Sequence, residues 1–177
     1  ITLYNEYFGG GMNTIVFQEM REARGLAYSA WANLAIPTNA KGDYYYMAFI
    51  ATQNDKMQKA IEAFDEIINN MPESEAAFKL AKEGLINRMR TDRIIKSDII
   101  WTYINAQDLG QNVDPRIKLY NDVQTMTLKD IVDFQKEWVK GRTYVYCILG
   151  DKKDLDMNKL KAVGPIEELT QEQIFGY

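Results

Sequence analysis

Three consecutive glycines, Gly9 to Gly11, interrupt a helical pattern at the start of this 177-residue chain and constrain its fold more than any other feature. Apolar side chains on both sides of them recur at the spacing of one helix face: Leu3, Tyr4, Tyr7, Phe8, Met12, Val16 and Met20. Each interior glycine costs a helix about 1 kcal/mol relative to alanine, so three in a row should bend or break it. The pattern predicts a helix over residues 1–24 that is interrupted near the glycines, either by a plain break or by close packing against a neighbouring backbone.

The next segment predicts a β-hairpin. Apolar and polar side chains alternate over residues 26–36, and Pro37 ends that pattern. Residues 38–43 have turn composition, and residues 44–52 are rich in aromatic and β-branched side chains. We therefore expect an antiparallel return strand, whose Tyr44–Tyr45–Tyr46 run lies at an edge able to accept an extended peptide.

Helical patterns dominate the rest of the chain and are followed by one strongly apolar run. The run at residues 143–149 is typical of a buried strand, and it contains the single Cys147, which we expect to pack as a small hydrophobe. The further expected elements are helices at 57–71, 74–93, 97–110, from 115 onward, 127–141 and 154–162, and a final strand at 166–169. This order predicts an α+β fold of two layers, with a mostly antiparallel sheet covered by helices, in a single domain.

Composition excludes several functions. With 46% hydrophobic and 26% charged residues, the chain has the make-up of an ordinary globular domain. Its net charge of −4 and its scattered basic residues argue against nucleic-acid binding. No apolar run approaches the roughly 20 residues needed to span a membrane, so we expect a soluble protein whose compartment the sequence does not fix.

Three motifs in this order give the chain a family resemblance: Gly9-Gly10-Gly11-Met12, Phe17-Gln18-Glu19 and Arg21-Glu22-Ala23-Arg24-Gly25-Leu26-Ala27-Tyr28-Ser29. The chain resembles the C-terminal half of the pitrilysin/insulinase family of inverted-motif zinc metallopeptidases. The likeness continues over most of the chain, through Ser74 with Ala81-Lys82, Asp108-Leu109-Gly110 and Gly150-Asp151. It implies that residues 1–177 form a single, non-zinc-binding peptidase half-domain with the two-layer fold, and we expect its amino end to be truncated inside a helix.

The zinc motif of that family, His-x-x-Glu-His, lies in the other half. This chain contains no histidine, so the resemblance implies that it binds no metal and that zinc is held by a partner half. Its carboxylates are spread along expected helix surfaces without matched spacing, and we interpret them as solvated faces.

Arg21 and Tyr28 are the candidate site residues. The resemblance implies that both reach toward the zinc half, where they bind the substrate backbone and help to stabilise the oxyanion. Arginine offers a fixed cationic fork and tyrosine a neutral hydroxyl, and both are donors suited to developing negative charge. The alternatives are an ion pair of Arg21 with Glu19 or Glu22, and a sheet-packing role for Tyr28. Arg24 is interpreted as a solvated neighbour.

The function that the resemblance implies is peptide-bond hydrolysis by an assembled enzyme, in which this chain encloses the peptide substrate and is inactive alone. Its partners are then a peptide and a homologous zinc-binding half, on the same polypeptide or a separate subunit. Two other classes remain: a catalytically inactive scaffold subunit of the same fold, and a stand-alone peptide-binding module. The stand-alone module is least favoured, because one half-domain by itself would bury too little of a peptide.

Overall fold

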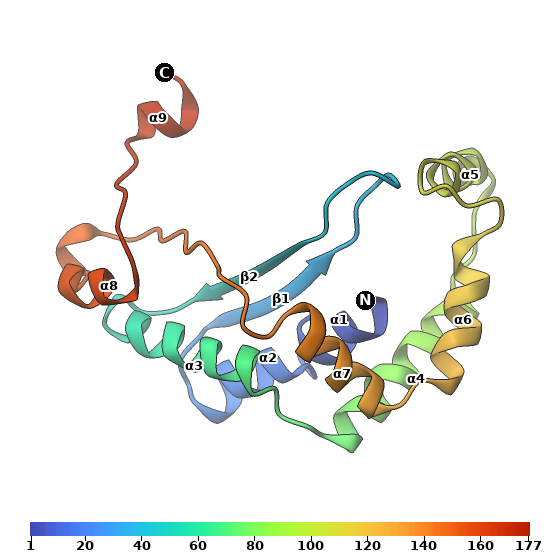
Figure 1. Ribbon diagram of the computed structural model, residues 1–177, viewed down its shortest axis with the longest axis horizontal. Coiled ribbons are helices and arrows are strands. Elements are labelled where there is room, and N and C mark those ends of the chain that lie inside the picture. Colours follow the sequence, from blue (N-terminus) through green and yellow to red (C-terminus); the bar gives the residue numbers. More distant parts are fainter.

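The computed structural model describes all residues from Ile1 to Tyr177 and confirms the α+β class. A two-stranded antiparallel sheet, β1 (Ser29–Ala35) and β2 (Tyr45–Ala51), lies against a layer of helices (Figure 1). In the register of this hairpin Trp31 stands opposite Phe49 and Ala32 opposite Ala48. The predicted hairpin is therefore confirmed.

The glycine segment ends the first helix where it meets the sheet. Helix α1 (Thr2–Phe8) stops at Gly9, whose carbonyl oxygen accepts from the Ala32 N–H at 3.1 Å. A Cβ atom on Gly9 would lie only 2.0 Å from the Ala32 carbonyl oxygen. The interruption thus combines a helix break with the close backbone packing predicted as its alternative. The chain then resumes as α2 (Ile15–Phe17) and the π-helix η1 (Gln18–Ala23).

The core lies between the sheet and the helices. Helix α1 buries four large side chains in it: Leu3, Tyr4, Tyr7 and Phe8. The inner face of β1 adds Ala30, Ala32 and Leu34. Helix α3 (Met57–Asn69) contributes six buried residues along one face, as its periodicity predicted. The core is completed by α7 (Leu128–Trp138), whose Ile131 and Val132 are buried.

Capping residues set the helix starts that the sequence predicted. Ser74 accepts from the Ala77 N–H at the start of α4 (Glu75–Thr91). Pro115 occupies the first turn of α6 (Pro115–Thr125), and Thr127 forms a capping box with Asp130 at the start of α7. The remaining elements are η2 (Asn54–Lys56), η3 (Lys96–Asp98), α5 (Ile99–Asp108), η4 (Lys152–Asp154), α8 (Met157–Val163) and α9 (Gln171–Phe175).

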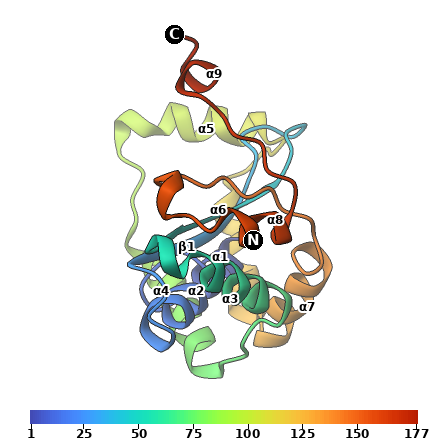
Figure 2. The same cartoon turned by 90° about the vertical axis from the view of Figure 1, so that its left-hand side faces the viewer.

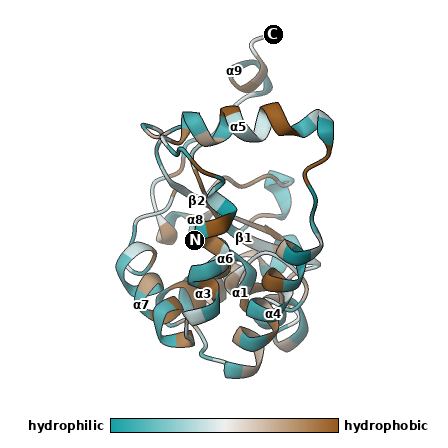
Figure 3. Cartoon of the chain, turned by 90° about the vertical axis from the view of Figure 1, so that its right-hand side faces the viewer, coloured by the Kyte–Doolittle hydropathy of each residue, from teal (hydrophilic) through white to brown (hydrophobic).

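Two parts of the chain lie apart from this body. Helix α5 sits beyond the ends of α4 and α6, and α9 lies at the end of an outlying C-terminal segment (Figures 1 and 2). Figure 3 shows apolar colour on part of α5. Ile99, Ile100 and Trp101 in this helix are all exposed. No helix combines the length and apolar character needed to cross a bilayer.

The strand predictions at 143–149 and 166–169 are wrong, because neither segment pairs with a strand in the structure. Residues 143–149 are free of helix and strand, and Cys147 is exposed rather than buried. Strand structure needs an aligned partner edge, which sequence composition alone cannot supply. The expected helix at 154–162 is split into η4 and α8.

Candidate functional site

A tight turn brings Arg21 and Tyr28 together. Arg21 lies in η1, and the chain then reverses through Gly25, whose φ of 57° is a left-handed value that suits glycine. The N–H groups of Leu26 and Ala27 both donate to the Met20 carbonyl oxygen, at 2.9 and 3.2 Å, which fixes the return. The Tyr28 N–H then donates to the Ala51 carbonyl oxygen at 2.8 Å and joins this segment to the end of β2.

The Arg21 guanidinium lies over two aromatic rings. Its Cζ atom is 5.4 Å from the centroid of the Tyr28 ring and 5.1 Å from that of Phe17. Such cation–π contacts contribute about 0.5–1 kcal/mol at exposed sites. The arrangement therefore orients the guanidinium beside the phenol without neutralising its charge.

Both side chains are open to solvent. Tyr28 is 80% exposed, which excludes the alternative that it packs within the sheet. The Nε atom of Arg21 lies 3.6 Å from Glu22 Oε1, and both side chains are well exposed. An exposed pair of this kind contributes at most about 1 kcal/mol. The predicted alternative partner Glu22 is thus present, but it holds Arg21 weakly.

Arg24 has a different role from the solvated one expected. It bonds Glu66 on α3 at 2.7 Å and lies 3.4 Å from Glu19, so it links η1 to the helix layer. The hydrogen bond from Arg24 holds the pKa of the Glu66 carboxyl below its ordinary value. The carboxylates near Arg24 in sequence, Glu19 and Glu22, both precede it, and its main partner, Glu66, lies on another helix, so the sequence carried no local signal for this pair.

No group of three or more histidine, cysteine, aspartate or glutamate side chains is placed to hold a metal ion. The chain also lacks histidine altogether. Its residues therefore do not fit the zinc site of a metallopeptidase, which needs nitrogen or sulfur ligands or clustered carboxylates.

A buried tyrosine cluster lies between the helices and the sheet. The Tyr4 hydroxyl donates to Gln135 Oε1 at 2.5 Å, and the Gln135 amide donates to the Ile68 carbonyl oxygen. The Tyr46 hydroxyl, which is buried, has no hydrogen-bond partner. Burial raises the pKa of the Tyr4 and Tyr46 hydroxyls far above the ordinary tyrosine value, so both stay neutral. This cluster is a polar part of the core.

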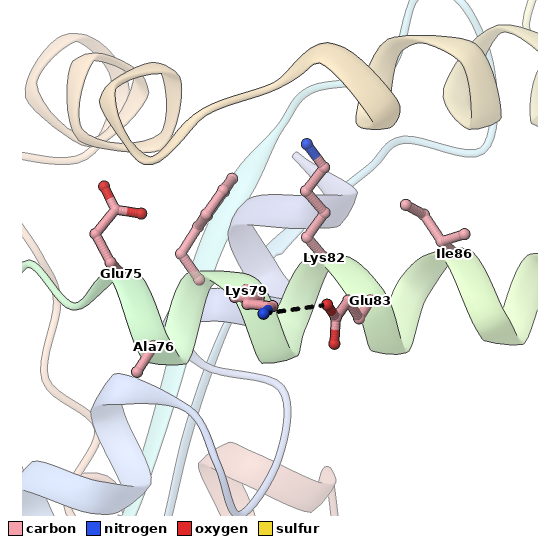
Figure 4. Close-up of a pocket in the computed structure, with 7 residues that line it drawn as sticks. Glu75, Ala76, Lys79, Lys82, Glu83 and Ile86 are labelled. Atoms are coloured by element: carbon pink, nitrogen blue, oxygen red, sulfur yellow. Dashed lines mark ion pairs between the residues drawn. The ribbon is translucent and has the colours of Figure 1, made fainter.

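A shallow groove follows α4 and is lined by Glu75, Ala76, Phe78, Lys79, Lys82, Glu83 and Ile86 (Figure 4). The ammonium of Lys82 donates to the carbonyl oxygens of Gln124 and Met126, at 2.9 and 2.7 Å. Lys79 and Glu83 form an exposed ion pair at 4.0 Å. Of the two cations that line the groove, Lys82 is therefore already used to tie α4 to the end of α6, and Lys79 is paired with Glu83.

Comparisons with known proteins bear on the fold. Residues 1–85 match the family described as the peptidase M16 inactive domain. A solved structure of a peptidase M16 inactive domain from Pseudomonas fluorescens superposes with a TM-score of 0.60 at 19% identity. The match covers 77% of this chain and 33% of that one, so this chain spans about a third of its length. No curated protein matches.

The resemblance to the C-terminal half of the pitrilysin/insulinase family is thereby confirmed. Residues 1–85 are similar in sequence to the peptidase M16 inactive domain, and the fold of the chain is similar to that of the solved example.

Proposed function

We propose that this chain is the zinc-free, substrate-enclosing half of a pitrilysin/insulinase-like metallopeptidase, with residues 1–177 forming a single half-domain. In the assembled enzyme Arg21 and Tyr28 donate hydrogen bonds to the bound peptide, and the reaction is peptide-bond hydrolysis. The chain alone is inactive. The match of residues 1–85 to a peptidase inactive domain supports a proposal in which this half contacts the substrate and the other half holds the zinc.

The observation that carries the proposal is the exposed juxtaposition of Arg21 and Tyr28. The guanidinium carbon lies 5.4 Å from the phenol ring, and Tyr28 is 80% exposed. Because the Tyr28 ring is so exposed, its burial contributes little to the stability of the fold. The neighbouring Arg21 carries a positive charge that is only weakly paired with Glu22. Such a pair suits a ligand that approaches from outside.

The chemistry of the two side chains fits the carbonyl groups of a peptide. Arginine stays protonated and presents its donors in a planar fork, whereas the tyrosine hydroxyl donates without carrying charge. Donors that are fixed before the reaction and aimed at a developing oxyanion contribute about 3 kcal/mol each to transition-state stabilisation. The ring contact holds the guanidinium in place beforehand.

The metal belongs to the other half in this proposal. Since the residues of this chain do not fit a zinc site, the homologous half supplies the zinc, which activates a water molecule when bound. This chain contributes binding, orientation and charge stabilisation only.

A catalytically inactive scaffold subunit of the same fold is the second candidate. The description of the matching family as an inactive domain favours it. The two functions differ in whether they require the hydrogen-bond donors of Arg21 and Tyr28: the peptidase half requires them and a scaffold does not.

A double variant separates these functions. In the complete zinc-containing assembly, Arg21→Ala with Tyr28→Phe should abolish most peptide hydrolysis while the protein still folds and assembles. Full activity in the folded double variant would contradict the donor role. An assembly that hydrolyses no peptide even with both residues intact would favour the scaffold.

A further inference from the structure

The position of the Tyr28 hydroxyl depends on the backbone that carries this side chain. The Tyr28 ring is exposed, and its cation–π partner, Arg21, is exposed as well. Side-chain packing therefore holds the phenol weakly. Because the hydroxyl stands at the far end of a long, rigid side chain, a small rotation of the backbone at residues 26–28 moves it by a larger distance.

One side chain bonds directly to that backbone. The N–H groups of residues 26–28 all donate to main-chain oxygens, but the Leu26 carbonyl oxygen accepts from no backbone N–H. It accepts instead from the Thr52 hydroxyl at 2.6 Å. The other carbonyl oxygen near this hydroxyl, that of Gln53, is 3.5 Å away, so the single hydroxyl proton is directed to Leu26.

Thr52 is anchored in the sheet, because it directly follows Ala51, the last residue of β2. The end of β2 holds the segment at two points. The Ala51 carbonyl oxygen accepts from the Tyr28 N–H, and the Thr52 hydroxyl donates to the Leu26 carbonyl oxygen. The residue between these points, Ala27, is buried. Since β2 pairs with β1 along its whole length, the sheet fixes both points.

The other polar side chains near the turn hold it less directly. The Lys56 Nζ atom is 3.4 Å from the Gly25 carbonyl oxygen, which is longer than an ordinary N–H···O hydrogen bond. Arg24 extends to Glu66 on α3 in a partly exposed ion pair and does not bond the backbone of residues 26–28. Thr52 is therefore the side chain with the short bond to the segment that leads into Tyr28.

We propose that Thr52 is a positioning residue for the peptidase site: by holding the Leu26 carbonyl oxygen, its hydroxyl sets the direction in which Tyr28 presents its own hydroxyl to the substrate. The inference rests on the proposed function of Tyr28. A donor to a developing oxyanion must be in place before the reaction, and an error of about 1 Å in such geometry costs about 100-fold in rate. Thr52 acts through Tyr28 and not on the substrate.

Two variants of Thr52 test the hydroxyl in the complete zinc-containing assembly. Thr52→Val keeps the shape of the side chain and removes the hydroxyl, so kcat should fall about tenfold with KM nearly unchanged, because the oxyanion forms only in the transition state. Thr52→Ser keeps the hydroxyl and should restore kcat to within about twofold of wild type. Thr102→Val is the matched control, since the Thr102 hydroxyl on α5 also donates to a backbone carbonyl oxygen, that of Asp98, at 2.8 Å. It should change neither quantity.

A double variant separates positioning from a merely structural role. Thr52→Val should cause no further loss of kcat in a Tyr28→Phe background, because the hydroxyl that Thr52 positions is then absent. The inference is overturned if Thr52→Val lowers kcat by the same factor in both backgrounds, or if it keeps wild-type kcat while Tyr28→Phe loses activity. Wild-type activity in Tyr28→Phe alone would instead overturn the proposed function of Tyr28, and the inference with it.

Hydrogen exchange of the 177-residue chain gives a second measurement that needs no activity. Thr52→Val should speed exchange of the Ala27 and Tyr28 amides by about tenfold and leave the Ala32 amide of β1 unchanged, because only the clamped segment is released. Thr52→Ser should leave all three unchanged. Equal acceleration of the three amides in Thr52→Val would show a general loss of stability and would overturn the inference, as would no acceleration at all.

Discussion

The Ala32 N–H donates to the Gly9 carbonyl oxygen at 3.1 Å, and this contact places the end of α1 directly on the backbone of β1. The same approach leaves no room for a side chain on Gly9, since a Cβ would stand 2.0 Å from the Ala32 oxygen. Asn5, one turn earlier, bonds both backbone groups of Leu34. Together these contacts close one edge of the hairpin with a helix.

Gly9→Ala should therefore destabilise the chain by about 3 kcal/mol, because α1 must move off the sheet to admit the methyl group. Gly11→Ala is the matched control, since a Cβ there meets nothing within 4 Å, and it should change the free energy of unfolding by less than about 1 kcal/mol. Urea unfolding measures both. Equal stabilities for the two variants would contradict the packing of α1 on β1.

Asn5→Ala should cost about 1–3 kcal/mol, because it leaves the N–H and carbonyl oxygen of Leu34 without their partner in a partly buried place. Asn87→Ala provides the control, since Asn87 is an exposed helical asparagine on α4. The control should be neutral or slightly stabilising through helix propensity. If the two variants unfold at the same urea concentration, the side chain of Asn5 does not cap the sheet edge.

Much of this architecture could be predicted from the sequence, and the rest could not for identifiable reasons. The apolar face of α3, the cap at Ser74 and the alternation of the hairpin are local patterns, and the structure has all three. Residues 143–149 show the limit, because composition indicates a strand but only a partner edge makes one.

The candidate site likewise has one part that the sequence predicted and one part that it did not. The motif placed Arg21 and Tyr28 close in sequence, and the turn at Gly25 brings them into contact. The link from Arg24 to Glu66 joins residues far apart in sequence and gave no local signal.

The Arg24–Glu66 link should make stability depend on pH. Arg24 lowers the folded-state pKa of Glu66, so the stabilisation is present above the ordinary carboxyl value near 4.5 and is lost as pH falls through the lower folded value. Relative to Glu66→Gln, the wild-type chain should be more stable at pH 7, and the difference should shrink below pH 4.5.

Glu62→Gln on the same helix is the control for this pH series, since Glu62 accepts a hydrogen bond from the Gln58 amide and forms no ion pair. Both variants are compared with wild type by urea unfolding from pH 3 to pH 7. High salt should reduce the Glu66 difference, because the pair is exposed. A pH-independent difference would show that the ion pair contributes nothing.

Cys147 should react readily in the folded chain, because it is exposed and is the single cysteine. A thiol reagent such as dithionitrobenzoate should label the native chain within about threefold of the rate in urea, since exposure rather than unfolding then limits the reaction. A buried strand at residues 143–149 predicts instead labelling slowed by several orders of magnitude. Native labelling that slow would mean that this segment is covered in solution.

The activity of the assembled enzyme provides the sharpest test of Arg21 and Tyr28. Tyr28→Phe removes one hydroxyl from a side chain that is 80% exposed, so the melting temperature should stay unchanged while kcat/KM falls about 100-fold, the scale for one oxyanion donor. Arg21→Lys should be nearly as damaging as Arg21→Ala, because a flexible ammonium cannot reproduce the planar fork held over the Tyr28 ring. Tyr177→Phe, at an 86% exposed tyrosine near the end of the chain, should change neither quantity. If Arg21 serves only its weak pair with Glu22, Arg21→Ala and Glu22→Ala will have equal and small effects on stability, and both will keep wild-type kcat/KM.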